Sequence, residues 1–193
     1  FVEQGRNEMP LFNFTLTLSG VSRSTPNLEE AFYHAHCDDA LICFYGTAVY
    51  LDFDRESDTL EQAILSAIRD IESAPDLNAR VESVDSTLVG LSDIAELTGV
   101  SRQAISLLKD GARGGGQFPA PIQRVKGNSP LWRWQTVVQW LVTAGRIAET
   151  SSMVAHARTL DSLNLALQLR ASQESKTVLH YFQRLEHTTA FSG

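Results

Sequence analysis

One short segment constrains the fold of this chain more strongly than any other. Residues 91–109 place a small residue, a glycine and two apolar residues at Ala95, Gly99, Ile105 and Leu108. Two helices that meet in a tight turn need a small residue at their contact, a turn residue that tolerates positive φ, and apolar side chains that hold the second helix. The spacing therefore predicts a helix-turn-helix. Its remaining inward positions are expected at Ile94, Leu97 and Val100.

The polar residues of this segment predict where its helices begin and what they face. Ser92 and Ser101 are suitable N-caps for the two helices. The start of the second helix would turn side chains outward, where a recognition helix contacts base edges in the major groove of DNA. Lys109 is better placed for a phosphate. An ordinary helical hairpin with a glycine turn is the alternative. The expected base-facing residues are Arg102, Gln103 and Ser106.

Two short strands joined by a turn are predicted after the helix pair. Residues 118–125 lead into a Lys126–Pro130 turn, and Leu131–Trp134 forms the returning strand. A hairpin of this kind beside a recognition helix is a wing, which offers a second element to the phosphate backbone. The predicted DNA-binding set adds Ser101, at the start of the recognition helix, to the base-facing residues, and its phosphate contacts are Lys109, Arg113, Arg124, Lys126 and Arg133.

Two features of the same region admit a second interpretation. The glycine-rich stretch 111–116 lacks the Gly-Lys-Ser/Thr of a phosphate-binding loop, so a flexible connection to the wing is favoured. The tryptophans Trp132, Trp134 and Trp140 could stack on unpaired bases. Their alternation with apolar residues favours the core of the domain instead, with an apolar helix over 134–142.

The first half of the chain has the pattern of an α+β sandwich. Residues 12–18 alternate apolar and polar side chains, as a half-buried strand does. Ser24-Thr25 before Pro26 signals a helix start. The segments 40–45 and 48–53 are rich in β-forming residues, and Gly46-Thr47 between them has the composition of a tight hairpin.

A second helix and a last strand complete this half. Asp58–Glu61 has the pattern of a capping box, and an apolar stripe follows at Leu60, Ile64, Ile68 and Ile71. Val81 and Val84 belong to the last strand. The order is then βαββαβ, which is that of the split-βαβ, ferredoxin-like sandwich.

The first half of the chain has no residue pattern that indicates a catalytic or metal site. His34, His36, Cys37, Asp38 and Asp39 carry metal-ligand atoms, but positions i and i+2 do not share a helix face and no second cluster completes a tetrahedral set. Buried, reduced thiols are the expected state of Cys37 and Cys43. No nucleophile has an evident base, so we predict no metal, no cofactor and no enzymatic activity.

A row of carboxylates lies in the second of the two predicted hairpin strands. Asp52, Asp54, Glu56 and Asp58 alternate with the apolar Leu51 and Phe53, so these carboxylates would share one face. They could in principle bind a divalent cation. A solvated strand face that protects the sheet from aggregation is favoured.

Charge is distributed unevenly along the chain. The 193 residues have 16 Lys and Arg against 23 Asp and Glu, a net charge of −7, which taken alone argues against a general nucleic-acid coat. Residues 1–84 hold 5 basic and 15 acidic side chains, whereas residues 102–146 hold 7 basic and 1 acidic. This asymmetry is typical of a segment that faces a polyanion. Chance clustering on a solvated face is the alternative.

Several motifs occur in an order that resembles known DNA-binding proteins. Phe118–Pro121, Trp132 or Trp134, and Trp140-Leu141 follow the helix-turn-helix. This order resembles the winged helix-turn-helix of the excisionase and mercury-resistance-regulator superfamily, over residues 88–142. With Cys37–Ala40 and Leu51–Arg55 before Ile94-Ala95, the chain from Met9 to Leu141 also resembles an uncharacterised bacterial DNA-binding family with an N-terminal α/β domain. The resemblance implies DNA binding and assigns no ligand to the first domain.

The C-terminal segment is predicted to be helical and to need a partner surface. Apolar residues recur at threes and fours and repeat after a polar break at 172–175. These stripes need an apolar cover, on their own domain or on another subunit. Because such DNA readers bind as two-fold dimers, we predict a homodimer. The stripes are Met153, Ala157, Leu160, Leu163 and Leu167, then Val178, Phe182 and Leu185.

The sequence thus predicts four segments and one main function. A tail (1–8) precedes an acidic ferredoxin-like domain (9–86), a winged helix-turn-helix (87–146) and a helical extension (147–193). We predict a cytoplasmic, sequence-specific double-stranded DNA-binding protein that regulates transcription in bacteria, including autoregulation as an antitoxin performs it. No apolar run approaches the roughly 18–20 residues that span a bilayer. The alternative is a protein-interaction module, for a toxin or a phage protein, that uses the winged fold without DNA contact.

Overall fold

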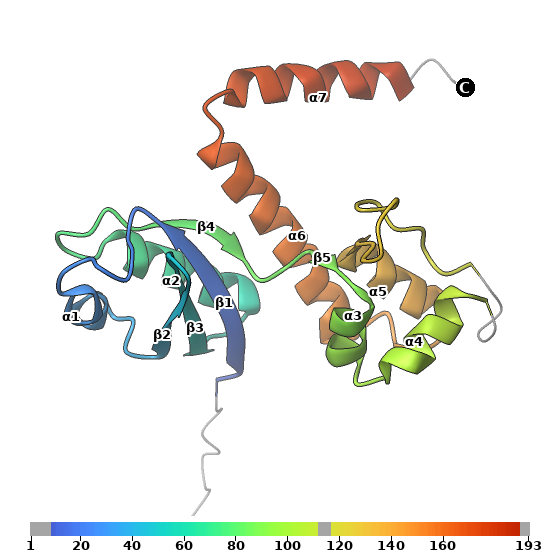
Figure 1. Ribbon diagram of the computed structural model, residues 1–193, viewed down its shortest axis with the longest axis horizontal. Coiled ribbons are helices and arrows are strands. Elements are labelled where there is room, and N and C mark those ends of the chain that lie inside the picture. The colour runs from blue at the N-terminus through green and yellow to red at the C-terminus, as the bar shows by residue number, and fades with distance from the viewer. Residues whose placement is uncertain (1–8, 112–116, 190–193) are drawn as a thin grey trace, which may run out of the picture. The chain divides into compact units, whose positions relative to one another are not determined.

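The computed structural model describes residues 9–111 and 117–189, with the side chains of the last helix described to Glu186. Its described residues form a mixed α+β fold with a four-stranded antiparallel sheet and seven helices. The chain divides into two compact units (Figure 1). Unit 1 comprises the residues up to Val84 and those from Leu163 onward, and unit 2 comprises Asp85–Ser162. The predicted C-terminal extension is therefore not a separate segment, because it is divided between the two units.

The sheet of unit 1 has the strand order β2-β3-β1-β4, and all neighbours are antiparallel. One face is apolar because every second residue of β1 points into the core, as the alternation over 12–18 predicts. Leu16 is fully buried, and the Phe14 ring stacks on that of Phe53 at 5.3 Å. The strands are β1 (Leu11–Ser19), β2 (Ala40–Tyr45), β3 (Ala48–Glu56) and β4 (Arg80–Val84).

The hairpin between β2 and β3 is the one that the sequence predicts. Tyr45 pairs with Ala48 across a two-residue loop, and Gly46 has φ 59°, a conformation that suits glycine. The acidic side chains of β3, at Asp52, Asp54 and Glu56, face away from the core. Asp52 there accepts a hydrogen bond from the Thr15 hydroxyl at 2.7 Å, so the carboxylate row lies on the open face of the sheet.

Helix α1 (Leu28–His34) begins later than the sequence predicts. Ser22 and Thr25 instead form a turn, in which the Thr25 hydroxyl accepts a hydrogen bond from the Ser22 amide at 2.9 Å. Asn27 then adopts φ 54° and starts the helix. Pro26 lies before this left-handed residue, so its fixed φ serves the turn and not the first helical turn.

Helix α2 (Leu60–Glu72) covers the apolar face of the sheet with the predicted stripe, whose four members are all buried. Its cap is Thr59, whose hydroxyl accepts a hydrogen bond from the Gln62 amide at 3.2 Å. The predicted capping box, which began at Asp58, is therefore wrong by one residue. The β-branched Thr59 takes the extended conformation that an N-cap needs.

A buried cation joins β3 to the segments around it. The Arg55 side chain is 9% exposed and donates two hydrogen bonds to Asp39, at 2.7 and 2.9 Å. It also donates to Asp70 at 2.7 Å and to the Ser66 hydroxyl at 3.0 Å. Burial lowers the pKa of Arg55, but the hydrogen bonds that Arg55 donates to Asp39 and Asp70, with the charges of these carboxylates, outweigh burial and raise the pKa overall. The guanidinium is therefore held as a cation with matched partners.

The two cysteines have different surroundings. Cys37 is 4% exposed, whereas Cys43 lies half-buried in β2. Burial, with a smaller contribution from Asp70, raises the pKa of Cys37 from 9.0 to about 12. Both thiols are free, as expected. The expected burial is confirmed for Cys37 and wrong for Cys43, whose side chain points to the open face of the sheet.

We expect Cys37 to be inert toward thiol reagents in the folded protein. A rise in pKa from 9.0 to about 12 lowers the thiolate population at pH 8 about a thousandfold. In alkaline buffer a disulfide reagent should therefore label the half-exposed Cys43 in the folded protein and Cys37 only after unfolding, so a Cys43→Ser variant should lose the faster phase. Since folding raises this pKa, its contribution to stability is present below pH 9.0 and is lost as the pH rises toward 12. Fast labelling of Cys37 in the folded Cys43→Ser variant would contradict the burial.

The C-terminal stripes meet different surroundings. The first lies on α6 (Ser152–Ala171), which buries Val154 and Ala157 in unit 2 and Leu167 in unit 1. The second lies on α7 (Ser175–Thr189), where Phe182 and Leu185 are 56% and 68% exposed. The chain thus covers the first stripe itself and leaves the second exposed. None of the described helices is both long enough and apolar enough to cross a membrane.

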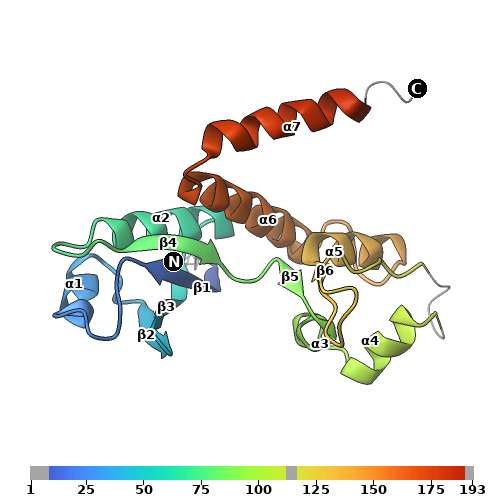
Figure 2. The same cartoon turned by 45° about the horizontal axis from the view of Figure 1, so that its top comes forward.

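Unit 2 combines a short sheet with three complete helices and the start of α6. In both views α3 lies next to α4 (Figures 1 and 2), and Figure 2 shows β5 beside β6. Leu88 pairs with Arg133 and Val89 with Trp132, in antiparallel register. The elements are β5 (Leu88–Val89), α3 (Leu91–Thr98), α4 (Arg102–Lys109), β6 (Trp132–Arg133) and α5 (Trp134–Thr143).

Candidate nucleic-acid interface

The helix pair α3–α4 forms around the landmarks that the sequence predicts. Gly99 has φ 66° and ends α3, and the Val100 amide donates to the Ala95 carbonyl at 3.1 Å. Ile94 and Ile105 are buried in the core of unit 2, and Ala95 packs against it. A small residue at the contact and a glycine in the turn are therefore confirmed.

Two predicted inward positions are wrong. Leu97 is 47% exposed and Val100 is 38% exposed. The buried face of α3 is formed by Ile94 with Leu91 and Ala95 beside it, so Leu97 falls to one side of that face at the helical period of 3.6 residues. Val100 lies in the turn after the helix and is exposed there.

Of the two predicted N-caps, the one at Ser101 is confirmed and the one at Ser92 is wrong. The Ser101 hydroxyl accepts a hydrogen bond from the Ala104 amide at 3.2 Å, which confirms Ser101 as the cap of α4. Ser92 lies inside α3, whose N-cap is Gly90. Asp93 takes over the capping role, because its carboxylate accepts a hydrogen bond from the Gly90 amide at 2.7 Å. The hydroxyl of Ser101 therefore has a structural duty besides any contact with DNA.

A tight hairpin follows at the predicted place, but the predicted returning strand Leu131–Trp134 is wrong in part. Only Leu131 pairs with the first arm, at Gln123, whereas Trp132 and Arg133 form β6 and pair with β5, and Trp134 begins α5. The Ile122 amide donates to the Leu131 carbonyl at 2.8 Å, and the Leu131 amide donates to the Gln123 carbonyl at 3.0 Å. The tryptophans belong to the core, as predicted: Trp132 is 1% and Trp134 is 5% exposed. The Trp132 ring donates through Nε1 to the Pro119 carbonyl at 2.8 Å, which anchors the segment before the hairpin.

The start of α4 and the turn of the hairpin meet in one cavity. This cavity has a volume of about 270 Å³, and Arg102 lines it together with the start of α3. The other wall is the turn, through Asn128, Ser129 and Pro130. The cavity thus joins the first residue of α4 to polar groups that no pattern in the sequence singled out, since a Lys-Gly-Asn-Ser-Pro turn reads as connection alone.

The predicted phosphate contacts differ in how free their charges are. Lys109 pairs with its neighbour Asp110, and this hydrogen bond lowers the pKa of Asp110, which therefore stays ionised. Arg133 pairs with Asp161 at 3.2 Å, and its side chain is 42% exposed. A phosphate contact by either cation would have to displace a carboxylate. Arg113 lies outside the described residues.

The remaining predicted residues lie on the surface. Gln103, Arg124 and Lys126 are exposed, and the Arg124 backbone has φ 53° in the turn that the Gly127 amide closes at 3.0 Å. Ser106 is half-buried, and its hydroxyl donates to Asp110 at 3.4 Å, so it faces its own helix end. The structure therefore brings Arg102 together with the hairpin turn and gives Ser106 an internal partner.

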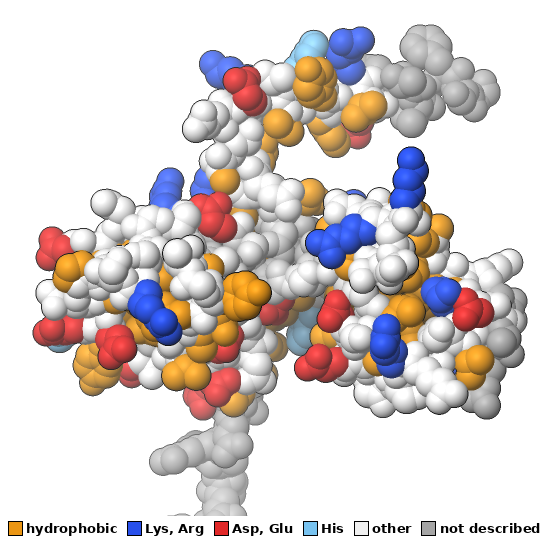
Figure 3. All heavy atoms as spheres, viewed as in Figure 1, with side chains coloured by type: hydrophobic (Ala, Val, Ile, Leu, Met, Phe, Trp, Pro, Cys, Tyr) orange, Lys and Arg blue, Asp and Glu red, His pale blue; other side chains and the backbone are white. Residues whose placement is uncertain are grey.

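The surface of unit 2 is mixed in charge. Residues 85–162 hold 8 Lys and Arg against 6 Asp and Glu, a net of +2, because the acidic residues before Arg102 and after Arg146 belong to the same unit. In the space-filling view, blue basic and red acidic side chains both appear on this unit (Figure 3). Arg146 lies over the Trp140 ring at 5.8 Å, so it too has a partner. The basic field is thus weaker than residues 102–146 suggest.

No cluster in the described part of the chain has three His, Cys, Asp or Glu side chains placed to hold a metal ion. Comparisons of the chain with protein families, with curated proteins and with solved structures found no match. The family resemblance that rests on the motifs therefore stays a prediction.

Proposed function

We propose that unit 2 is a winged helix-turn-helix domain that binds double-stranded DNA with sequence specificity and regulates transcription, including autoregulation of the antitoxin kind. Such a protein would work in the cytoplasm, where bacterial DNA lies. The observation that carries the proposal is the cavity that Arg102 shares with the hairpin turn. It places the exposed start of a capped, eight-residue helix beside a β-hairpin, which is the arrangement that lets helix and wing contact one duplex.

Arg102 and Gln103 would contact base edges, because they occupy the first turn of α4 and are exposed. Arg124 and Lys126 would contact phosphates from the hairpin turn. Lys109 and Arg133 would contribute only after exchanging Asp110 and Asp161 for phosphate. We expect Arg133 in particular to keep its ion pair with Asp161 and not to contact phosphate, because the Asp161 side chain is only 15% exposed.

The proposal is tested by selecting DNA that the whole protein binds and measuring affinity against salt. Genuine phosphate contact predicts that log Kobs falls linearly with log salt, with a slope near −0.9 per phosphate contact. The exposed cations Arg124 and Lys126 of the wing, together with Arg102, therefore predict a modest slope of log Kobs against log salt, about −2 to −4. Selection of no sequence, together with affinity independent of salt, would reject DNA binding.

We predict different effects for two basic residues of this interface. Arg102→Ala should mainly relax sequence preference, because one good bidentate base contact is worth about 1–3 kcal/mol. Lys126→Ala should weaken binding to every sequence alike and reduce the salt slope by about one unit. Fluorescence anisotropy on the selected site and on random DNA separates the two effects. Arg158→Ala, which removes an exposed charge from α6, is the matched control. Equal losses on both DNAs from both interface variants would refute this division.

Unit 1 would be the ferredoxin-like domain, since its element order is βαββαβ and its strand order is β2-β3-β1-β4. This name describes the fold and implies no ligand. We propose no enzymatic role for it.

A protein partner for unit 2 is the second candidate, and one observation favours it. A cavity of about 370 Å³ has the apolar Val89, Leu97 and Trp134 among its lining residues, together with the acidic Asp93 and Glu96 of α3. The exposure of Leu97 leaves this lining uncovered by the unit's own residues. A basic, apolar peptide segment would suit it. Leu97→Glu should abolish such binding and leave DNA affinity unchanged, which titration calorimetry with a captured partner would show.

A further inference from the structure

The two edge strands of the unit 1 sheet, β4 and β2, differ in whether side chains bond their outward backbone groups. Side chains cap β4: the Val81 amide donates to Glu72 at 3.0 Å, and the Val81 carbonyl accepts from Arg170 at 2.8 Å. Asn164 accepts from the Val84 amide at 3.0 Å and donates to its carbonyl at 2.6 Å. These contacts satisfy backbone groups that would otherwise accept another strand. The β4 edge is therefore closed.

The outward groups of β2 can be identified from the pairing of β2 with β3. The Asp54 amide donates to the Asp39 carbonyl at 2.9 Å, which makes these two a hydrogen-bonded pair. Because such pairs alternate in an antiparallel ladder, Leu41, Cys43 and Tyr45 also bond toward β3. The amide and carbonyl groups of the intervening residues then point away from the sheet. These are the groups of Ile42 and Phe44.

At the start of the strand the Ala40 amide donates to the Cys37 carbonyl at 3.2 Å, but none of the described residues caps the outward groups of Ile42 and Phe44. No hydrogen bond joins the backbone of Ile42 or Phe44 to a side chain or loop in the part of the chain that the structure describes. The strand Ala40–Tyr45 also carries no charge and no proline, which are the usual means of blocking an edge. Leu41 is 67% and Tyr45 is 83% exposed on the open face. An uncharged six-residue edge of this composition invites another strand.

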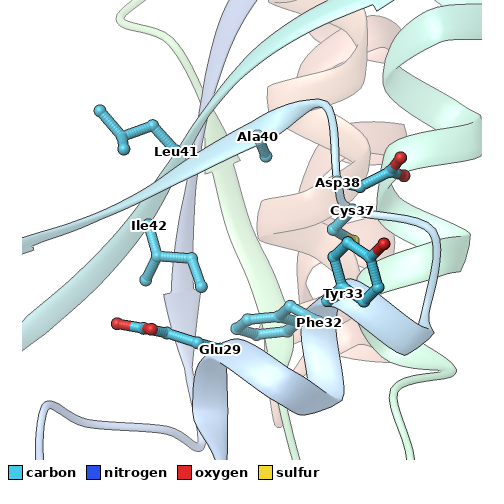
Figure 4. A pocket seen from close by; sticks show the side chains of 8 residues that line it. All are labelled: Glu29, Phe32, Tyr33, Cys37, Asp38, Ala40, Leu41 and Ile42. Carbon is cyan, nitrogen blue, oxygen red and sulfur yellow. The ribbon is translucent and has the colours of Figure 1, made fainter.

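A cavity lies beside the same edge strand, on the face of the sheet that α1 covers. It has a volume of about 330 Å³ and lies between α1 and β2, with Phe32 and Ile42 in its wall (Figure 4). The Glu29 carboxylate lies on the same side of the cavity as Ile42 (Figure 4). At the other end of the strand, the Arg23 guanidinium lies over the Phe44 ring at 5.1 Å. An anion and a cation thus flank the two outward-facing residues.

We propose that β2 is the homodimerisation surface of this protein, on which β2 of a second copy pairs antiparallel about Cys43. This register places Ile42 opposite Phe44 of the second copy and matches each outward amide with an outward carbonyl. It also places Leu41 opposite Tyr45 of the second copy, so the two most exposed apolar side chains of the strand cover one another. The result is a continuous eight-stranded sheet with both remaining edges closed.

Charge complementarity selects a second copy as the occupant. With Ile42 opposite Phe44 of the second copy, the Arg23 that lies on that Phe44 is carried toward the Glu29 beside Ile42. The two-fold axis repeats this pair, so two Arg23–Glu29 contacts flank the junction. The Phe44 ring of each copy faces the cavity between α1 and β2 of the other. An unrelated strand would need to carry the same cation at the same position.

The proposed register makes Cys43 a direct reporter. Cys43 of one copy would lie opposite Cys43 of the other in a non-hydrogen-bonded pair, whose Cα atoms are about 4.5 Å apart. Copper–phenanthroline oxidation should therefore link two chains through one disulfide, with the two electrons taken up by copper(II). Burial and the Asp52 carboxylate raise the pKa of Cys43, so the reaction is run in alkaline buffer. The linked dimer should form in Cys37→Ser and be lost in Cys43→Ser.

Two variants test the pairing without removing the reporter. Ile42→Pro removes an outward amide that has no described partner, and proline is tolerated on an edge strand when its nitrogen faces outward. Leu41→Glu places like charges near the two-fold axis. Each should raise the dimer dissociation constant about tenfold or more, a change measured by sedimentation velocity across the micromolar range. Leu11→Glu, at a 57% exposed leucine of β1, is the matched control and should remain dimeric.

The exposed stripe of α7 offers the competing dimer surface, and the outcomes separate the two. A dimer that survives Ile42→Pro and Leu41→Glu but dissociates in Phe182→Glu overturns the proposal, as does a monomeric wild type with no Cys43 crosslink. A dimer lost in the two β2 variants, retained in Leu11→Glu and Phe182→Glu, and crosslinked through Cys43 supports it. Circular dichroism of each variant verifies that the sheet has formed. DNA affinity is measured separately, so failure of either proposal leaves the other standing.

Discussion

Gly20→Ala is expected to destabilise unit 1 by about 3 kcal/mol or more, because it combines backbone strain with overlap. Gly20 has φ 77°, in the left-handed region that costs other L-residues about 1–2 kcal/mol. A Cβ at this position would also overlap the Asn78 carbonyl oxygen and lie 2.9 Å from its carbon. Both are backbone atoms of the segment that leads into β4, so neither can rotate away.

Gly46→Ala provides the matched control. Gly46 also has positive φ, at 59°, but nothing lies within 4 Å of an added Cβ. Its cost should be the backbone term alone, about 1–2 kcal/mol. Hydrogen exchange of β1 and β4 peptides reports on unit 1, while tryptophan fluorescence reports on unit 2, where all three tryptophans lie. Equal losses in the two variants would show that the Asn78 contact relaxes at no cost.

Asp39→Ala is expected to cost about 3 kcal/mol, at the lower end of the range for breaking a buried ion pair. It removes two hydrogen bonds to Arg55 and leaves this 9% exposed guanidinium with Asp70 as its one described carboxylate. The Asp39 side chain is 30% exposed, so solvent screens part of the interaction and the upper end is not expected. Urea unfolding followed by hydrogen exchange in β3 measures the loss.

Asp54→Ala is the control that removes a carboxylate next to Arg55 in the sequence without removing a partner of Arg55. Asp54 lies on the neighbouring position of β3 and bonds an exposed Asn13 side chain, so its removal should change stability by no more than about 0.5 kcal/mol. Arg55→Met combined with Asp39→Ala should recover part of the loss, because it removes the buried guanidinium that lacks a partner. Recovery is only partial, since the Asp70 carboxylate, 24% exposed, then loses its cation. Failure of the double variant to recover stability would show that the aspartate acts through something other than Arg55.

Much of the local structure could be predicted from the sequence. The hairpin at Gly46, the turn at Gly99 and the cap at Ser101 depend on contacts within a few residues, and each is confirmed. Helix starts were less accurate: the helix expected after Ser24-Thr25 begins at Leu28, and the cap expected at Ser92 belongs to Gly90. Several residue types satisfy a cap equally well, so neighbouring packing decides which is used.

The candidate interface was predicted in part. The exposure of Arg102, Gln103, Arg124 and Lys126 agrees with the pattern of unit 2, because polar residues at those positions follow from the apolar ones. The acidic partner of Lys109 is its neighbour in the sequence, whereas the acidic partner of Arg133 is distant in the sequence. Asp110 could have been foreseen beside Lys109, whereas Asp161 lies 28 positions from Arg133 and no local pattern connects them.

The sequence by itself determined the apolar faces, the turns and the helix pair, because periodicity and positive φ act over short stretches of chain. Tertiary structure alone decided which sheet edge is closed. Asn164 reaches Val84 across 80 positions and Arg170 reaches Glu72 across 98, and only folding brings them together. Nothing comparable reaches Ile42 among the described residues. Which edge stays bare is therefore a consequence of where the second half of α6 docks, which no local pattern encodes.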